Sequence, residues 1–251
     1  MAKPALHSFS TLTFDVVGTL IDFERGIIDW FRRWLRGHAV DKTDEEILAA
    51  FAVCEDYYQK RSPEKPFTAM LPLICNDMAA GWGMSADEND GMDFRSSIRQ
   101  WPAFADSRAA LAELKKCFRL VAVTNADSWA LRYMSASLDD PFAESVTCDE
   151  VGINKPSHQV FSYVLEKLAR HGVSKDDILH VAQSQYHDIR PASEMGFATA
   201  WIERRRGQMG FGATPEPALI VEPDFHSDSM AGFVDQVRRS GWLSARALKT
   251  S

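Results

Sequence analysis

The segment that most constrains the fold is residues 11–17, an apolar and β-branched run that contains Asp15 and is followed by Gly18-Thr19. Such a run is typical of a buried strand in a parallel sheet. Gly18 predicts the end of the strand and the start of a loop. Open α/β sheets place their active sites at the carboxyl ends of the strands. Asp15 is therefore either a structural acid or a functional carboxylate, since buried acids are uncommon unless they are paired or functional.

The size and charge of the chain limit its class. Its 251 residues suffice for one large domain or for a core with an inserted subdomain. The net charge of −7 gives no basic footprint for nucleic acid, and we interpret the short run Arg204-Arg205-Arg206 as a solvated loop. We expect no membrane span and no signal peptide, because no apolar run is long enough and residues 1–10 lack an apolar core.

The four cysteines show neither paired nor metal-type spacing. We expect them to be reduced thiols, and we expect the protein to be cytoplasmic.

Helical patterns follow the first strand without another strand between them. Asp22 can cap a helix that ends near Gly37, and Thr43 to Glu46 has the form of a capping box. Two more helices are expected at 67–82 and 85–100. The sequence therefore predicts an all-helical insertion over residues 23–98, with a core formed by residues 1–22 and 99–251.

Strands and helices alternate after residue 101. Strands are expected at 119–123, 145–148, 178–182, 198–202 and 219–221. Helices are expected at 107–116, 127–137, 156–172 and 188–195, with Pro156 in the first turn of the third. This alternation predicts an α/β fold with a doubly wound, Rossmann-like parallel sheet.

Polar residues follow several of these strands and should meet at one edge of the sheet. They are Asp15, Thr124, Asn125, Asn154, Lys155, Ser184 and Asp188. Each has an ordinary alternative: Asn125 can cap a helix, Lys155 can be exposed, and Asp188 can be an N-cap.

Taken in order, these residues resemble the motifs of the haloacid dehalogenase superfamily. The motifs are Asp15 to Thr19, Val123 to Asn125, Lys155-Pro156, and Gln183 to Asp188. The resemblance implies that residues 23–98 form the cap domain of that family. Segments 101–104, 184–188 and 210–214 make the chain most similar to type II 2-haloacid dehalogenases and, in particular, to azetidine-2-carboxylate hydrolases.

Two departures concern metal. Phosphatases of the superfamily carry a second aspartate at the position of Val17 and a metal-binding aspartate at the position of Gln183. Magnesium prefers hard oxygen ligands, usually carboxylates. We therefore expect neither metal nor cofactor. A magnesium-dependent phosphatase and a non-catalytic binding protein on the same fold remain the alternatives.

The resemblance implies a role for each motif residue. Asp15 attacks the carbon that bears the leaving group and forms a covalent ester, Lys155 keeps Asp15 ionised, and Asp188 positions or deprotonates water. Thr19, Thr124 and Asn125 orient Asp15 and bind the substrate carboxylate, with Ser184 and Gln185 near the water and Val17 against the substrate. The partner is then a small-molecule carboxylate that loses a halide or a ring nitrogen, and a homodimer is compatible with the sequence.

Further departures concern the predicted cap. Haloacid dehalogenases usually have tyrosines at the positions of Val17 and Phe161, and an arginine in the cap where this chain has Val53. Arg61 is nearby but cannot be placed from the sequence. Glu55 lies in the same predicted helix and could face an amine, although we interpret it as a solvated helix acid. Aromatic residues of the cap are expected to exclude water.

Overall fold

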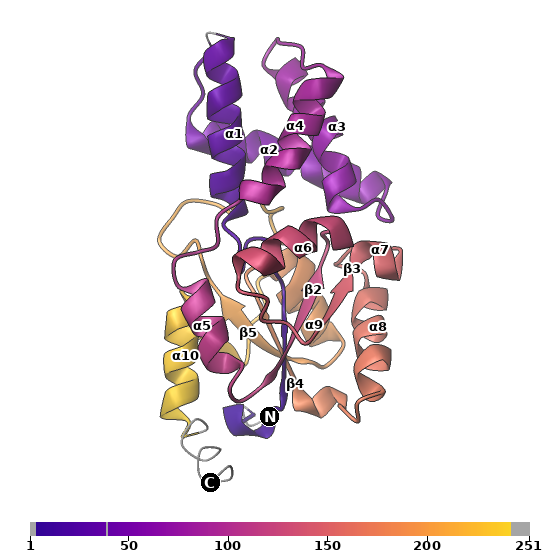
Figure 1. Cartoon of the computed structure of the whole chain (residues 1–251), viewed down its shortest axis with the longest axis vertical. Coiled ribbons are helices and arrows are strands. Elements are labelled where there is room, and N and C mark those ends of the chain that lie inside the picture. The colour runs from indigo at the N-terminus through magenta and orange to yellow at the C-terminus, as the bar shows by residue number, and fades with distance from the viewer. Residues whose placement is uncertain (1–3, 39, 242–251) are drawn as a thin grey trace.

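The computed structural model describes residues 4–38 and 40–241, so residues 1–3 and 242–251 of the predicted core lie outside the described residues. The described chain contains a six-stranded parallel sheet in the order β3-β2-β1-β4-β5-β6 (Figure 1). The strands are β1 (Thr11–Phe14), β2 (Arg119–Thr124), β3 (Glu144–Thr147), β4 (Ile178–Ala182), β5 (Ala198–Ile202) and β6 (Phe225–Ser227). The predicted α/β parallel sheet is confirmed.

Strand β1 lies at the centre of the sheet, and its register brings the motifs together. Thr13 is opposite Val121 of β2 and opposite His180 of β4. All four residues of β1 are buried, as expected for a strand covered on both faces. The loops that follow β1, β2 and β4 therefore start side by side at one edge.

Helices cover both faces of the sheet, which makes it doubly wound. They are α5 (Ser107–Leu114), α6 (Ser128–Ser137), α7 (Cys148–Val151), α8 (His158–Ala169), α9 (Arg190–Glu194) and α10 (Met230–Arg239). Alternate residues of β2 enter different apolar clusters, because successive side chains of a strand point to opposite faces. Leu120 packs in the cluster that contains α5, α6 and α10, whereas Val121 packs in the one that contains α8.

The first strand is shorter than predicted. It ends at Phe14 rather than at residue 17, because the chain turns back on itself: the Leu20 and Ile21 amides both donate to the Val16 carbonyl. Gly18 has φ +89° in this turn, a conformation that favours glycine. Asp15 consequently stands directly beyond the strand.

Two other predictions of elements were wrong. Residues 219–221 form no strand; Leu219 is 62% exposed, and the Val221 backbone pairs with the Gln185 side chain. The last strand is β6, beside β5. Pro156 precedes helix α8, which begins at His158 with Ser157 as its N-cap. Helix α10 was not predicted.

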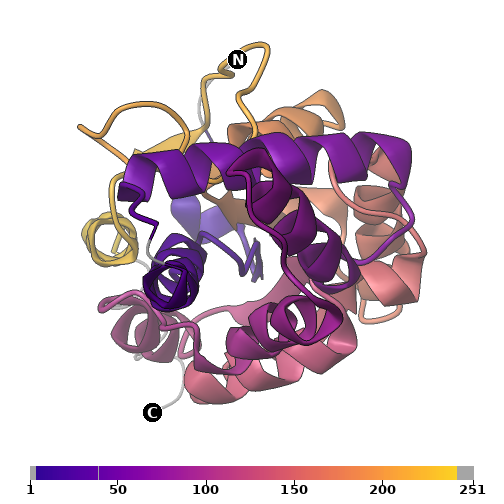
Figure 2. The same cartoon turned by 90° about the horizontal axis from the view of Figure 1, so that it is seen from above.

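Helices α1 (Phe23–Gly37), α2 (Asp44–Arg61), α3 (Phe67–Gly81) and α4 (Glu88–Ser96) lie together above the sheet edge that carries the motifs (Figures 1 and 2). A short 3₁₀ turn, Ser97–Gln100, follows α4. Asp22 caps α1 and Thr43 forms the capping box of α2, as predicted. The division into a core and a cap at residues 23–98 stays a prediction.

Hydrogen bonds tie this helical layer to the loops of the sheet. The Phe67 amide donates to the Asn125 carbonyl at 3.3 Å, and Thr68 donates to Asp127. The Asn154 side chain donates to the carbonyls of Pro63 and Lys65. The helices are thus attached next to the loops that carry Asn125 and Lys155.

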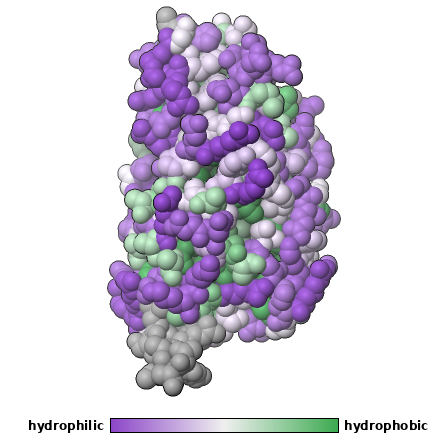
Figure 3. Space-filling view, viewed as in Figure 1, coloured by the Kyte–Doolittle hydropathy of each residue, from purple (hydrophilic) through white to green (hydrophobic). Residues whose placement is uncertain are grey.

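The polarity of the surface and the state of the cysteines are as the sequence predicts. The face shown in Figure 3 is mainly hydrophilic, with smaller hydrophobic patches, most of them in its lower half. All four cysteines are free, as expected. Within residues 4–38 and 40–241, no helix combines the length and the apolarity that crossing a membrane requires.

Candidate active site

A cavity of about 40 Å³ lies between the sheet edge and the helical layer; the empty space is about 420 Å³ when the part open to solvent is counted. The sheet loops contribute Asp15, Val17, Asn125, Lys155, Ser184 and Asp188. The helical layer contributes Phe23, Glu55, Gln59 and Phe67. Most of the predicted site residues therefore meet in one place, and the aromatic residues of the helical layer that face it are Phe23 and Phe67.

Asp15 is held by a different donor on each carboxylate oxygen. Lys155 Nζ lies 2.9 Å from Oδ1, and Thr19 Oγ1 donates to Oδ2 at 2.6 Å. The Thr19 hydroxyl itself accepts from the Gln183 amide at 2.8 Å, which directs its proton to Asp15. The Asp15 side chain is thus fixed in orientation, and its residue is only 5% exposed.

Arg204 supports the same loop from behind. Its Nε and Nη2 both donate to the Thr19 carbonyl, and its Nη1 pairs with Asp106 at 2.9 Å. The side chain is 8% exposed. Arg205 is paired with Glu24, whereas Arg206 is exposed. The interpretation of residues 204–206 as a solvated loop was wrong for Arg204 and Arg205. Both form ion pairs with acids that are distant in the sequence, Asp106 and Glu24, and local sequence does not reveal such pairs.

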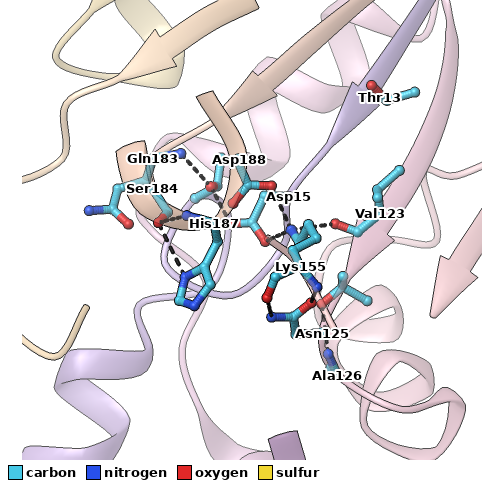
Figure 4. Close-up of polar contacts among 12 residues, drawn as sticks. Thr13, Asp15, Val123, Asn125, Ala126, Lys155, Gln183, Ser184, His187 and Asp188 are labelled. Atoms are coloured by element: carbon cyan, nitrogen blue, oxygen red, sulfur yellow. Dashed lines mark hydrogen bonds and ion pairs between the residues drawn. The ribbon is translucent and has the colours of Figure 1, made fainter. Parts of the chain in front are cut away.

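Lys155 is the centre of the polar cluster (Figure 4). Its ammonium group donates to Asp15 Oδ1 at 2.9 Å, Asp188 Oδ1 at 2.6 Å and the Val123 carbonyl at 2.9 Å. An ammonium group has three N–H donors, so these contacts use all of them. The residue is only 1% exposed. Its ammonium group is therefore a buried counter-ion that the two carboxylates share.

Asn125 and Thr124 have other tasks than those expected. The Asn125 side chain accepts from the Lys155 amide at 2.7 Å and donates to the Lys155 carbonyl at 3.0 Å. It therefore positions Lys155 rather than Asp15. Thr124 Oγ1 accepts from the Ala126 amide and is not among the cavity-lining residues, so direct contact with a substrate is not expected.

Asp188 has one engaged and one unpartnered oxygen. Oδ1 accepts from Lys155 and from His180 Nε2 at 3.0 Å, while Thr13 Oγ1 lies 2.9 Å from His180 Nδ1. Because a carboxylate only accepts, His180 Nε2 carries a proton and donates it to Asp188. Oδ2 is buried without a hydrogen-bond partner among the described residues. His180 was not predicted from the sequence, although a polar residue inside an apolar strand is the signal that could have found it.

The environment separates the two acids. Burial, together with the nearby Asp188 charge, raises the pKa of Asp15 by more than Lys155 and Thr19 lower it. Burial also opposes ionisation of Asp188, but Lys155 and His180 outweigh it and lower its pKa. Burial would lower the pKa of Lys155, but the two carboxylates raise it. Asp188 therefore has the lower pKa and Asp15 the higher one. Because a more basic carboxylate is a better nucleophile, Asp15 is the better nucleophile of the two when it is ionised.

A second hydrogen-bonded chain crosses the cavity from the sheet to α2. Ser184 Oγ lies 3.2 Å from His187 Nδ1, and His187 Nε2 lies 2.7 Å from Gln59 Oε1. Gln59 Nε2 donates to Glu55 Oε1 at 3.1 Å. Gln59 and His187 were not predicted, because their packing depends on how the helices sit on the sheet. Ser184 lines the cavity as expected.

Glu55 is buried rather than solvated, so that interpretation was wrong. It is 5% exposed, and burial together with Asp56 raises its pKa to about 8. Burial likewise lowers the pKa of His187 to about 4. Near neutral pH the second chain therefore contributes little charge.

Other residues singled out by the sequence lie away from the cavity. The Gln185 amide is engaged with the Val221 backbone, so its expected place near the water is wrong. Val53 is 70% exposed, and Arg61 lies over the Tyr57 ring. Phe161 packs in the core against His180. Among the described residues, no arginine lines this cavity.

The residues present do not fit a magnesium ion. Lys155 Nζ lies between the Asp15 and Asp188 carboxylates, and the neighbouring lining positions hold the apolar Val17 and the amide of Gln183. Magnesium requires several hard oxygen ligands in octahedral geometry. In the described part of the chain, no group of three His, Cys, Asp or Glu residues is placed to hold a metal.

Asp15 directly after the central strand β1 and Lys155 in the loop between α7 and α8 meet at one edge of a doubly wound sheet, beneath a helical layer, as in a class of α/β enzymes whose active sites lie at this edge. The comparison with protein families identifies it: residues 9–196 match the haloacid dehalogenase-like hydrolases, and the chain belongs to this family. A comparison with curated proteins gave no match.

Solved structures share the fold at low sequence identity. The defluorinating L-2-haloacid dehalogenase Rha0230 has a TM-score of 0.76 at 15% identity, covering 93% of this chain and 98% of that one. The L-2-haloacid dehalogenase from Xanthobacter autotrophicus with chloropropionic acid covalently bound has 0.75 at 19%, covering 92% and 98%. YfnB from Bacillus subtilis, a putative hydrolase of this family bound to magnesium, has 0.74 at 17%, covering 92% and 99%.

Proposed function

We propose that this protein is a metal-independent hydrolase that displaces a leaving group from a carbon next to a carboxylate, through an ester on Asp15. The observation that carries the proposal is the Asp15 carboxylate in the cavity wall, with Lys155 and Thr19 each fixing one of its oxygens. Carboxylates act as covalent nucleophiles when they are held ionised and aligned. The haloacid dehalogenase fold is compatible with this chemistry.

In the first step an Asp15 oxygen attacks the carbon. A carbon–oxygen bond forms, and the bond to the leaving group breaks with departure of its electron pair. Val17 occupies the cavity wall where the phosphatases of the superfamily place a general acid. The leaving group must therefore depart without a proton from that position, as a halide does, or already carry one, as a ring ammonium does.

In the second step water hydrolyses the ester. Asp188 Oδ2 accepts a proton from the water, and the resulting hydroxide attacks the Asp15 carbonyl carbon. The ester carbon–oxygen bond breaks, and the hydrogen of the attacking hydroxide moves to the departing oxygen, which restores the Asp15 carboxylate and leaves a hydroxyl group on the product carbon. The proton held by Asp188 then passes to solvent. Attack at a chiral carbon is followed by attack at the carbonyl, so the product has the inverted configuration.

Single turnover in heavy-oxygen water tests the proposal. With enzyme in excess over 2-chloropropionate or azetidine-2-carboxylate, we expect the label in the Asp15 side chain, located by peptide mass spectrometry, and an unlabelled first product. Direct attack by water would place the label in the first product and leave Asp15 unlabelled. That result would reduce Asp15 to a base and refute the ester mechanism.

A further inference from the structure

We propose that Glu55 binds a positively charged nitrogen of the substrate, so that the cavity selects a small amino acid over a simple carboxylate of the same shape. The inference rests on the proposed function, since it names the substrate class of the same site. It assigns a specificity-determining residue in α2 that faces the cavity opposite the Asp15 loop.

The first argument is that the cavity offers no available cation among its described lining residues. Lys155 uses all three of its N–H donors on protein oxygens. His187 remains neutral near pH 7, because burial lowers its pKa to about 4. When both acids are ionised, the three groups Asp15, Asp188 and Lys155 together carry a formal charge of −1 before any substrate enters. A substrate with only a carboxylate would meet repulsion without a compensating ion pair.

The second argument is the position of Glu55. It lines the same cavity as Asp15, is 5% exposed, and has the neutral Gln59 amide as its hydrogen-bond donor. Gln59 is oriented by His187: its oxygen accepts from His187 Nε2, so its N–H faces Glu55. A buried carboxylate held by one neutral amide is poorly compensated. A substrate ammonium supplies the opposite charge that this position lacks.

The third argument gives a measurable proton balance. With a pKa of about 8, Glu55 is about nine-tenths protonated at pH 7. When an ammonium group binds, the pair carboxylate and ammonium contains one proton fewer than the two separate groups. That proton passes to the buffer. The count is the same whether the proton that stays in the pair is on the Glu55 oxygen or on the substrate nitrogen. Binding of an amine should therefore release about 0.9 proton.

The experiment uses the Asp15→Asn variant, which binds without turnover, and three ring compounds matched in shape. Azetidine-2-carboxylate carries both charges, azetidine only the positive one and cyclobutanecarboxylate only the negative one. Titration calorimetry at pH 7 in two buffers of different ionisation enthalpy gives affinity and proton release together. Because Asp15→Asn makes the cavity less negative, it favours the anion and biases the test against the proposal.

We expect azetidine-2-carboxylate and azetidine to bind with release of about one proton, and cyclobutanecarboxylate to bind much more weakly. Adding Glu55→Gln should abolish the proton release and raise the Kd of azetidine-2-carboxylate at least about 30-fold. Adding Glu45→Gln, the same change at an exposed position of the same helix, should alter neither. Equal binding of cyclobutanecarboxylate, or an unchanged proton release with Glu55→Gln, would overturn the inference.

The two proposals fail in different ways. Heavy oxygen in Asp15 of the wild-type enzyme together with equal binding of the three compounds would overturn the role of Glu55 alone. A cation preference that depends on Glu55, with no label in Asp15 after turnover of azetidine-2-carboxylate, would support Glu55 and overturn the ester mechanism.

Discussion

Asp15 and Asp188 are the same chemical group in two environments. Both oxygens of Asp15 receive hydrogen bonds, and burial raises its pKa, whereas Asp188 has a lowered pKa and one buried oxygen without a partner among the described residues. Environments that push two acids apart in pKa commonly separate their roles. Here the lowered pKa keeps Asp188 ionised, with one oxygen left to accept from a water, while the hydrogen bonds to both oxygens of Asp15 align it for attack.

The variant Asp15→Asn should lower kcat at least about 1,000-fold, because an amide is a far weaker nucleophile than a carboxylate. Its Tm should stay the same or rise, since the change removes one of two buried carboxylates that share a single lysine. Steady-state kinetics and a thermal melt check both. In the wild type, the acid limb of kcat/KM should lie above pH 3.8, the ordinary pKa of the carboxyl. Substantial residual turnover in a pure variant would contradict the assignment.

Helix α2 and the short π-helical turn Gln185–Ile189 meet through the hydrogen bond between Gln59 and His187. Gln59 also donates to Glu55, so Glu55 and His187 are the two neighbours of Gln59. Burial raises the pKa of Glu55 and lowers the pKa of His187. Stability from Glu55 is complete below pH 4.5 and is lost as the pH rises through about 8. Stability from His187 is complete above pH 6.5 and is lost as the pH falls through about 4.

The two contributions oppose each other between pH 4.5 and 6.5, so the window from pH 6.5 to 8 isolates Glu55. There its contribution should fall by up to about 1.4 kcal/mol per pH unit. Urea unfolding at pH 6.5 and 8 should show a steeper loss of stability in the wild type and in Glu45→Gln than in Glu55→Gln. Equal pH dependence in all three proteins would show that Glu55 is not held protonated by burial.

The whole molecule brings its chemistry together through the sheet. Asp15 follows β1 directly, Asp188 follows β4, and Lys155 lies in the loop between α7 and α8, which comes after β3. The parallel order β3-β2-β1-β4 brings these loops to one edge, where Lys155 contacts both carboxylates. Lys155 Nζ stands between the two carboxylates, in a position that a cation bridging them would need. The assembled site therefore uses an ammonium group as its resident positive charge.

Turnover of a substrate panel should survive dialysis against EDTA, because the assembled oxygen ligands do not suit magnesium. The panel comprises 2-chloropropionate enantiomers, fluoroacetate, azetidine-2-carboxylate and p-nitrophenyl phosphate. We expect activity within about twofold of the untreated enzyme on the carboxylates. Loss of activity that magnesium restores, above all on the phosphate ester, would instead establish the phosphatase alternative.

The sequence predicted that Asp15, Lys155 and Asp188 would meet, because polar residues that follow parallel strands converge at one edge and because their order matches the motifs of the haloacid dehalogenase superfamily. Their catalytic roles stay predictions. Capping residues such as Asp22 and Thr43 were also identified, because capping depends on residues adjacent in sequence.

Contacts between distant segments could not be predicted in this way. Glu55 and Arg204 are of residue types that usually lie on the surface. Glu55 is buried because α2 packs on the sheet, and Arg204 is buried in an ion pair with Asp106. Thr124 and Gln185 have suitable chemistry, but local hydrogen bonds occupy their side chains. The apolar residues 219–221 suggested a strand although two of them are exposed.

Asn125 connects the helical layer to the loop that carries Lys155. Its carbonyl accepts from the first amide of α3, and its side chain hydrogen-bonds both to the amide and to the carbonyl of Lys155. Because one residue makes both contacts, a displacement of Asn125 would disturb the attachment of α3 and the position of Lys155 together.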